Sequence, residues 1–323
     1  MTSALQYAGT LDELKRKGRL VLRGAHRPIL LVYDGDCVYA LDNRCPHMGF
    51  PLHRGSVEDG ILTCHWHHAR FDLASGCTFD LWADDVPTCA VEIRGGEIWV
   101  QPEFGHADPG AYSRQRLEAG MAHNLGLVIA KSVQGQLTAG MPARDIVRQA
   151  ALFGARNLEG WSTGMTILTA LGNLMDSLPP EQIYLGLLHG ARKVAADCEG
   201  APAARQRAPL VSRPQASALK RWLRRWSSVR HPDAAQRTLL TGIEAGLRPA
   251  LLADLLFAAE TDRVFADNGH SLDFINKAFE CLDLIGWEHA RVVLPSVVGQ
   301  MVAARGAEEA TEWRQPRDLV ALC

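Results

Sequence analysis

Cys45-Pro46-His47 and Cys64-His65-Trp66-His67 are the two short stretches that decide how this chain is organised. The first has the spacing Cys-x-His and the second has Cys-x-x-His, so each offers one thiolate and one imidazole. In a two-iron cluster, such a mixed set places two sulfurs on one iron and two imidazoles on the other. Two cysteines and two histidines also satisfy a tetrahedral structural zinc ion. The tight Cys-x-His spacing favours the two-iron cluster.

The composition is that of an ordinary globular protein. The chain is 47% hydrophobic and 22% charged. Its 323 residues are enough for two domains. The formal net charge of −2 gives no electrostatic reason to expect nucleic acid or a membrane as a partner. The chain begins without a basic-then-apolar signal pattern and contains no run of eighteen apolar residues, so we expect a cytoplasmic protein. Cysteines other than Cys45 and Cys64 lack framework spacing and are expected to be free thiols.

The region 19–101 has the pattern of a small all-β domain. Asp34-Gly35-Asp36 and Gly95-Gly96 are expected to form hairpin turns between short β-rich runs. A short helix is predicted just before this region, around residues 11–15. The expected strands cover residues 20–22, 29–33, 38–41, 61–63, 69–73, 90–93 and 98–100. Both cysteine–histidine pairs therefore fall in loops that follow strands.

The residues around the two pairs resemble a known family. Asn43-Arg44-Cys45-Pro46-His47-Met48-Gly49 and Thr63-Cys64-His65-Trp66-His67-His68-Ala69-Arg70-Phe71-Asp72-Leu73-Ala74-Ser75-Gly76 are similar to the two cluster-binding loops of Rieske [2Fe–2S] domains. The resemblance implies that Cys45 and Cys64 bind one iron and that His47 and His67 bind the other. It places His65 and His68 at positions that do not bind iron. The resemblance covers about the first 105 residues.

The chain departs from one branch of that family. Rieske proteins of respiratory complexes carry an additional cysteine in each loop, and the two form a disulfide. Phe50 and Trp66 stand at these places here, so the sequence resembles the ferredoxin and oxygenase branch. That branch is expected to have a potential toward the low end of the Rieske range, which is roughly −150 to +300 mV.

Beyond a linker at residues 101–110, the sequence predicts a second, all-helical domain. The expected domains are 1–105, with the cluster, and 106–323, with helices at 124–138, 143–156, 165–178 and 181–196, a loop at 197–216, and further helices from 217 onward. Ala139-Gly140-Met141 and Ala245-Gly246-Leu247 each precede an apolar helix. This weak repeat predicts two similar helical halves.

Four histidines of the helical domain are candidates for a second metal. A Rieske cluster carries one electron and needs a donor and an acceptor, which in oxygenases is commonly a mononuclear iron with two histidines and one carboxylate. The usual oxygenase pattern for that iron is missing from this sequence. A distant resemblance to the helical questin-oxidase type of non-haem iron oxygenases instead suggests a histidine-bound Fe(II). The candidate ligands are His123, His189, His231 and His270, although each taken singly is more often a capping or hydrogen-bonded structural residue.

Two functions remain open. In the first, the chain is a Rieske-type oxygenase whose cluster passes electrons to a non-haem iron in the helical domain, for O₂-dependent oxidation of a small organic substrate. In the alternative, it is a ferredoxin-like electron carrier or redox sensor whose helical domain serves docking or oligomerisation without a metal. The sequence identifies no catalytic residue. It contains no glycine-rich nucleotide loop, so an external reductase or ferredoxin is expected, and a homo-oligomer fits either function.

Overall fold

The computed structural model describes residues 5–23, 27–102, 104, 108–311 and 314–322. The chain divides into two compact units, Met1–Ser113 and Arg114–Cys323, which we call the β unit and the helical unit. The expected domain boundary between residues 105 and 106 lies outside the described residues. Along the described chain, none of the helices is long and apolar enough to span a membrane.

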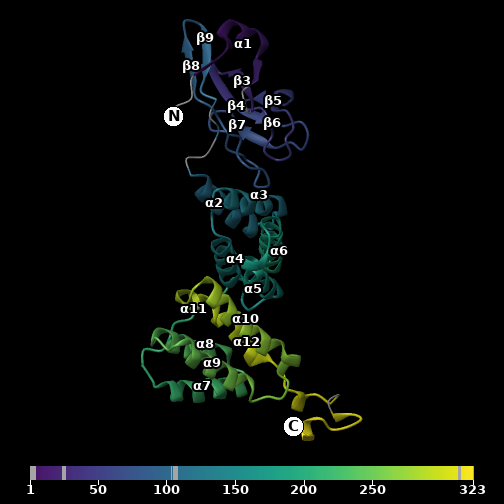
Figure 1. Ribbon diagram of the computed structural model, residues 1–323, viewed down its shortest axis with the longest axis vertical. Helices are drawn as coiled ribbons and strands as arrows, with labels where there is room; N and C mark the ends of the chain where they lie inside the picture. The colour runs from purple at the N-terminus through teal and green to yellow at the C-terminus, as the bar shows by residue number, and fades with distance from the viewer. Residues whose placement is uncertain (1–4, 24–26, 103, 105–107, 312–313, 323) are drawn as a thin grey trace. The chain divides into compact units, whose positions relative to one another are not determined.

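The β unit contains three antiparallel sheets of three strands each, with the orders β1-β9-β8, β2-β3-β4 and β5-β6-β7. Figure 1 shows the short helix α1 (Leu11–Lys17) beside the first two of them. The strands are β1 (Gln6–Thr10), β2 (Arg19–Arg23), β3 (Pro28–Asp34), β4 (Cys37–Asp42), β5 (Ser56–Glu58), β6 (Ile61–Thr63), β7 (Arg70–Asp72), β8 (Val91–Arg94) and β9 (Glu97–Val100). This agrees with the expected all-β domain, and β1 and β5 are the strands that the sequence did not predict.

Strand β3 is buried on both faces and separates two hydrophobic cores. Successive side chains of a strand point to opposite faces, and here Ile29 and Leu31 enter one core with Leu14 and Ile98. Leu30 and Val32 enter the other core, with Leu52, Leu62 and Phe71. The second core underlies the loops that carry the cysteine–histidine pairs, so packing of β3 positions those loops.

Local signals set the turns and caps of the β unit. Gly35 and Asp36 join β3 to β4 with φ values of 55° and 64°, and Gly95 and Gly96 join β8 to β9 with 56° and 86°. Positive φ at both central residues is the geometry of a two-residue hairpin turn that matches strand twist. The hairpins predicted at these two places are therefore confirmed.

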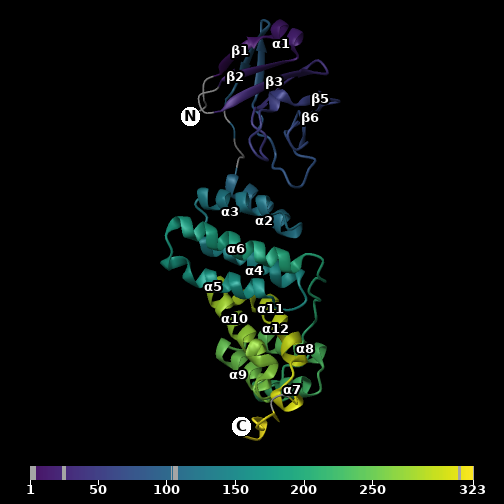
Figure 2. The ribbon, with the colours of Figure 1, turned by 90° about the vertical axis from the view of Figure 1, so that its right-hand side faces the viewer.

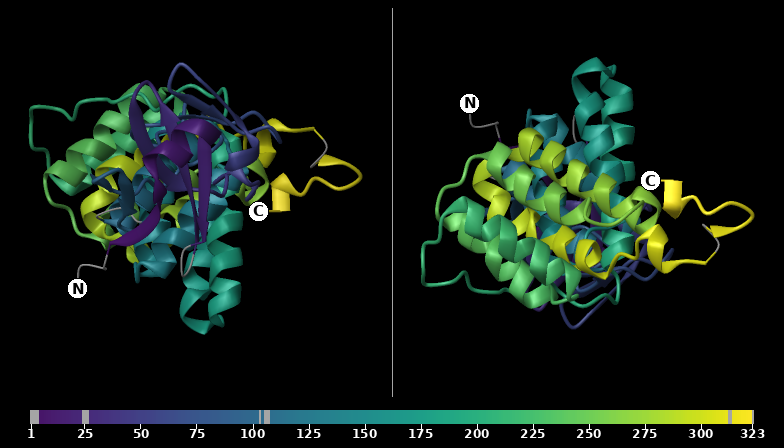
Figure 3. Two further views of the ribbon diagram at one scale, coloured as in Figure 1. Left: turned by 90° about the horizontal axis from the view of Figure 1, so that it is seen from above. Right: turned by 90° about the horizontal axis from the view of Figure 1, so that it is seen from below.

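The helical unit is built from helices that share one continuous core. Figures 1 and 2 show α10, α11 and α12 lying between the group α2–α6 and the group α7–α9, and Figure 3 shows α5 and α6 side by side. The helices are α2 (Pro109–Ala122), α3 (Gly126–Thr138), α4 (Ala143–Asn157), α5 (Thr163–Leu174), α6 (Pro180–Cys198), α7 (Ala216–Ser228), α8 (Pro232–Glu244), α9 (Pro249–Glu260), α10 (His270–Ile285), α11 (Ala290–Val293) and α12 (Pro295–Ala303), with short 3₁₀ segments at Met175–Ser177, Ala266–Gly269, Trp287–His289, Ala307–Glu309 and Val320–Leu322. A further 3₁₀ segment, Leu52–Arg54, lies in the β unit.

The two Ala-Gly stretches end their helices in the same way. Gly140 and Gly246 have φ values of 79° and 73°. Met141 N–H donates to the Gln136 carbonyl at 3.0 Å, and Leu247 N–H donates to the Gly242 carbonyl at 3.1 Å. These are the 6→1 bonds of a glycine-ended helix C-terminus. The shared ends fit two similar halves locally, and the wider repeat stays a prediction.

Candidate metal centre

The loops after β4 and β6 have the same backbone hydrogen-bond pattern. Cys45 N–H donates to the Phe50 carbonyl and Cys64 N–H to the Ala69 carbonyl, both at 2.8 Å. Four residues after each cysteine, an N–H returns to the cysteine carbonyl, from Gly49 at 2.7 Å and from His68 at 2.9 Å. Each loop is thus a closed turn with its cysteine at the base. The histidine two or three residues later is placed on the turn itself.

The two thiols lie together below the surface. Cys45 is 3% exposed and Cys64 is 1% exposed, and both belong to the core beneath the loops. Burial raises the pKa of the Cys45 thiol to about 11, with Cys64 contributing, while backbone N–H groups of His47 and Met48 act in the opposite direction. Such donors compensate a sulfur that becomes a thiolate on binding metal. The pair is therefore suited to hold one metal ion.

The two imidazoles meet edge to face. The ring centroids of His47 and His67 are 4.8 Å apart with an interplanar angle of 86°. His67 is exposed, whereas His47 is half-buried against Trp82, at 4.8 Å between centroids. His65 and His68, which the resemblance places off the metal, are both exposed. The arrangement of two buried sulfurs and two adjacent imidazoles fits the donor set of a mixed-ligand two-iron centre.

An aromatic contact joins the two loops at the positions where respiratory Rieske proteins have a disulfide. The rings of Phe50 and Trp66 are 6.0 Å apart, and Trp66 also lies 4.7 Å from the His67 ring. The seven described cysteines are free of disulfides, and Cys323 lies outside the described residues. Packing of two aromatic rings thus links the loops in place of a covalent bond.

Buried polar residues hold the first loop in place. Asn43 is 4% exposed, and its Oδ1 accepts a hydrogen bond from His53 N–H at 2.8 Å across the base of the loop. Arg19 Nη1 donates to the carbonyls of His53 and Gly55, both at 2.7 Å. A Cβ on Gly55 would stand 2.2 Å from the Thr63 carbonyl oxygen. Gly55 therefore lets the exit of the first loop lie directly against the start of the second.

A third loop, residues 77–87, covers the site and was missed from the sequence. Asp80 is 8% exposed and accepts hydrogen bonds from Arg70 N–H at 2.8 Å and from Arg70 Nη2 at 2.7 Å. These bonds to Arg70, opposed by burial, hold the pKa of the Asp80 carboxyl below its usual range. They fix the loop that brings Trp82 against His47. Spacing could not reveal this pairing, because it joins residues ten positions apart across a turn.

Large apolar side chains are exposed on all three loops. The exposed fractions are 59% for Met48, 52% for Trp66, 57% for Phe79 and 56% for Leu81. All four belong to the three loops that carry His47, His67 and Trp82. We call these four residues the apolar rim.

The four histidine candidates of the helical unit are exposed and are carried by different helices. His123 follows the end of α2, His189 lies in α6, His231 caps α8 by accepting from Ala234 N–H at 3.3 Å, and His270 begins α10 against Phe274. Within the described ranges, no three histidine, cysteine or acidic side chains gather in a way that could hold a single metal ion. The structure therefore does not bring these four histidines to one point.

Comparison with known proteins agrees with the geometry of the β unit. Residues 5–88 match the family model described as the Rieske [2Fe-2S] domain. The chain is 30% identical over 96 residues to the 3-phenylpropionate/cinnamic acid dioxygenase ferredoxin subunit of Photorhabdus laumondii, covering 29% of this chain and 90% of that protein. It is 39% identical over 82 residues to the vanillate O-demethylase oxygenase subunit of a Pseudomonas species, covering 23% of this chain and 25% of that protein.

A solved structure of the same kind is the ferredoxin of carbazole 1,9a-dioxygenase from Nocardioides aromaticivorans. It is 31% identical, with 31% of this chain and all of that chain covered, and the TM-score is 0.30. The chain spans less than half the length of several other curated relatives, between 12% and 46% of three of them. A Rieske domain implies a [2Fe–2S] cluster and supports electron transfer. Through the unit that holds the two loops, this chain belongs to the Rieske [2Fe–2S] family.

Proposed function

We propose that this chain is a one-electron carrier whose iron centre is held by Cys45, Cys64, His47 and His67. The observation that carries the proposal is the layered arrangement of this site, with the two thiols buried at its base and the two imidazoles meeting edge to face above them. A [2Fe–2S] cluster held there accepts and releases single electrons. The residues around the cluster determine how a partner protein reaches it.

The loops control which side of the site a partner can reach. Cys45 and Cys64 pack into the core beneath the loops, so a partner protein cannot reach the site from that side. His67 is exposed, and the apolar rim stands on the same loops and on the covering loop. A partner that buries the rim brings its own redox centre toward the imidazole edges. We infer that an external reductase and an electron acceptor use this face in turn.

An oxygenase is the second candidate, because the β unit is similar to the vanillate O-demethylase oxygenase subunit. In that function, the chain would also oxidise a small organic substrate with O₂ at a non-haem iron of the helical unit. The similarity covers only 25% of that relative, and His123, His189, His231 and His270 do not gather. The carrier therefore explains the arrangement of both units better.

Iron and acid-labile sulfide counted per chain on anaerobically purified protein test both candidates. The carrier predicts about two irons and two sulfides, with a Rieske-type spectrum on reduction. Cys45→Ser and His67→Ala should each remove this spectrum, whereas His68→Ala, in the same loop, should retain it. Loss of cluster iron from His68→Ala but not from His67→Ala would overturn the ligand assignment.

The histidines of the helical unit provide the second arm of the test. His123→Ala, His189→Ala, His231→Ala and His270→Ala should each leave the iron content unchanged if the chain is a carrier. A third iron that remains in Cys45→Ser, and is lost from any of these four variants, would instead favour the oxygenase.

A further inference from the structure

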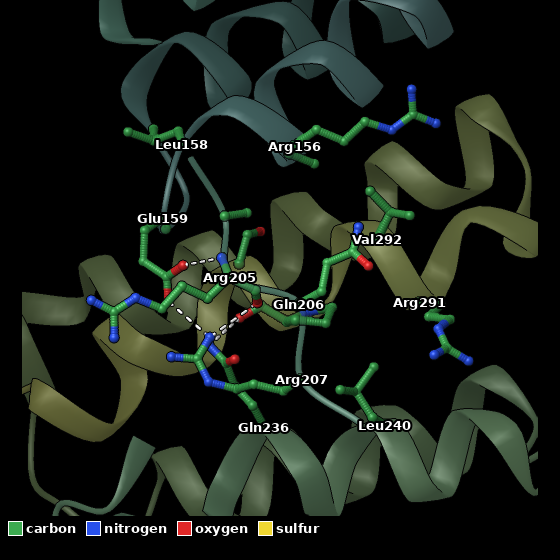
Figure 4. A pocket seen from close by; sticks show the side chains of 15 residues that line it. Arg156, Leu158, Glu159, Arg205, Gln206, Arg207, Gln236, Leu240, Arg291 and Val292 are labelled. Atoms are coloured by element: carbon green, nitrogen blue, oxygen red, sulfur yellow. Dashed lines mark hydrogen bonds and ion pairs between the residues drawn. The ribbon is translucent and has the colours of Figure 1, made fainter. Parts of the chain in front are cut away.

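A cavity of about 180 Å³ opens in the helical unit, and neither function above uses it. Its wall comes from the end of α4, residues 158–160, residues 204–207 of the long connection, α8 and the corner between α11 and α12. These segments are distant in sequence and belong to one compact unit. Figure 4 shows Glu159, Arg205 and Arg207 on one flank of the cavity and Arg156, Val292 and Arg291 on the other.

The charged residues of the wall are strongly unbalanced. Arg156, Arg205, Arg207 and Arg291 stand against a single acidic residue, Glu159. This contrasts with the whole chain, whose formal net charge is −2. Arg207 is paired with Asp233 and Arg291 with Glu244, both outside the lining, so the excess positive charge of the wall rests on Arg156 and Arg205.

Arg207 and Glu159 neutralise each other within the wall. Glu159 accepts from Arg207 Nη1 at 2.9 Å with one carboxylate oxygen and from Arg205 N–H at 2.6 Å with the other. Arg207 also donates from Nε to Asp233 at 2.5 Å. Burial works to lower the pKa of Arg207, but Asp233 and Glu159 together raise it. Both oxygens of Glu159 are therefore occupied, and its charge is compensated.

The arginines at the mouth differ from Arg207. Arg156, Arg205 and Arg291 are exposed, and Arg291 is paired with Glu244. Within the described part of the chain, the guanidinium groups of Arg156 and Arg205 form no ion pair. Exposed arginine side chains are free to turn toward a bound anion, and ordering them costs rotamer freedom that the charge-assisted contact must offset. Arg205 lies within electrostatic range of Asp233. The mouth therefore carries two guanidinium groups that no described acidic side chain holds in an ion pair.

Apolar side chains also line the cavity. Leu240 and Ala155 are 3% and 4% exposed, and Leu158, Val292 and Pro295 complete this part of the wall. An apolar cavity of about 150 Å³ in a protein core holds one benzene molecule. A space of about 180 Å³ thus suits a single six-membered ring or a short branched chain rather than a polycyclic compound.

We propose that this cavity binds a small organic carboxylate, with a compact apolar body against Leu240 and Val292 and its carboxylate toward Arg156 and Arg205. Arginine recognises carboxylates through paired N–H donors, and the apolar wall selects against small hydrophilic anions. The site is separate from the loops of the β unit. A test of ligand binding at this cavity is therefore independent of the electron-transfer function.

Isothermal titration calorimetry at low ionic strength tests the proposal with benzoate, acetate and inorganic phosphate as probes. Benzoate should bind with one site per chain and a dissociation constant of roughly 1 mM or below. Acetate retains the charge but lacks the ring, and should bind at least about tenfold more weakly because it forfeits the apolar contact. Phosphate should not displace benzoate at equal concentration.

Matched arginine variants locate the site. The double variant Arg156→Gln/Arg205→Gln should weaken benzoate binding about tenfold or more, because it removes two charged donors. Arg213→Gln removes an exposed arginine of the same long connection outside the cavity, and should change the affinity less than about twofold. No saturable benzoate binding, equal affinity for benzoate and acetate, or unchanged binding in the double variant would each overturn the proposal.

Discussion

The β unit and the helical unit each contain a set of cysteine or histidine candidates, but only the β unit brings its set together. Cys45, His47, Cys64 and His67 lie in two adjacent loops, and their imidazole rings are 4.8 Å apart. The four histidines of the helical unit sit on separate helices and are exposed. Closely spaced residues in a closed turn have their geometry fixed by local hydrogen bonds. Whether side chains on different helices come together depends on which face each helix buries. Packing of the whole core determines that face.

The largest expected effect breaks the contact between the two loops of the β unit. In Gly55→Ala, the new methyl would lie 2.2 Å from the Thr63 carbonyl oxygen, which is backbone and cannot move aside alone. We expect the β unit to lose roughly 3 kcal/mol or more of unfolding free energy, and to lose its visible absorption on mild heating. Differential scanning calorimetry should show the transition of the helical unit unchanged.

Gly299→Ala is the matched glycine of the other unit. No atom lies within 4 Å of the added methyl, and the residue is inside α12. Alanine there should stabilise the helical unit by about 0.5–1 kcal/mol without affecting the absorption of the cluster. If Gly55→Ala behaved as mildly as Gly299→Ala, close packing of the two loops would not be what holds the site.

Residue patterns were sufficient for the β unit because its determinants are local. The pairs of turn residues with positive φ, the apolar run of β3 and the spacing of the cysteine–histidine pairs all act within a few residues. Strand β5 was missed although it pairs with the neighbouring Ile61–Thr63 across Asp59-Gly60, a local turn signal. Strand β1 was missed because it pairs with Glu97–Val100, far away in the sequence. Trp82 was missed for the same reason, since the bonds between Arg70 and Asp80 bring it to His47.

In the helical unit, the helices were predictable and the positions of their histidines were not. His189 lies in an apolar stretch of the sequence, yet its side chain is exposed. The buried positions of α6 include Leu187, Gly190, Ala191 and Val194, which recur at helical spacing and leave His189 on the opposite face. His231 takes the capping role that was its simpler interpretation. Helical periodicity, applied to each histidine in turn, would have separated His189 from the core.

Glu260 provides a pH test confined to the helical unit. It is 2% exposed, Ser271 donates to its Oε1, and its Oε2 accepts no hydrogen bond from the described residues. Burial raises the pKa of this carboxyl, against opposing effects of Ser271 and Arg263. A raised pKa in the folded state favours the protonated form, so this contribution to stability is complete below the unfolded pKa and is lost as pH rises through the folded value.

Glu260→Gln should therefore be more stable than the natural protein at pH 8, by about 1–2 kcal/mol, since it removes a buried charge. The difference should shrink as the pH is lowered to 5. Melting temperatures of the helical transition at several pH values measure both trends. Glu288→Gln, which changes an exposed carboxylate with 71% of its side chain accessible, should show no such trend. A difference between Glu260→Gln and the natural protein that is constant from pH 5 to 8 would contradict the assignment.

Trp66→Ala tests the aromatic link between the loops of the β unit. It removes the contact with Phe50 at 6.0 Å and the contact with His67 at 4.7 Å. We expect a loss of about 1 kcal/mol and faster release of iron to a chelator, because an aromatic pair contributes roughly 0.5–1.5 kcal/mol. Phe79→Ala, an equally exposed aromatic with 57% accessible surface, should change both quantities by less. Equal effects of the two variants would mean that the ring contact does not restrain the loops.

The smallest predicted effect comes from a difference at the fifth residue of the two turns that hold the site. Their backbone bonds correspond, yet the fifth residue is Gly49 with φ of 82° in the first turn and His68 with φ of 62° in the second. A residue with a Cβ pays about 1–2 kcal/mol in this conformation, whereas glycine loses more backbone entropy on folding. His68→Gly should thus stabilise the β unit by about 0.5 kcal/mol. Gly49→Ala, whose methyl meets no atom within 4 Å, should destabilise it by about 1 kcal/mol. Thermal unfolding of both variants measures the pair, and destabilisation by His68→Gly would mean that the exposed imidazole makes a contact worth more than the backbone strain it carries.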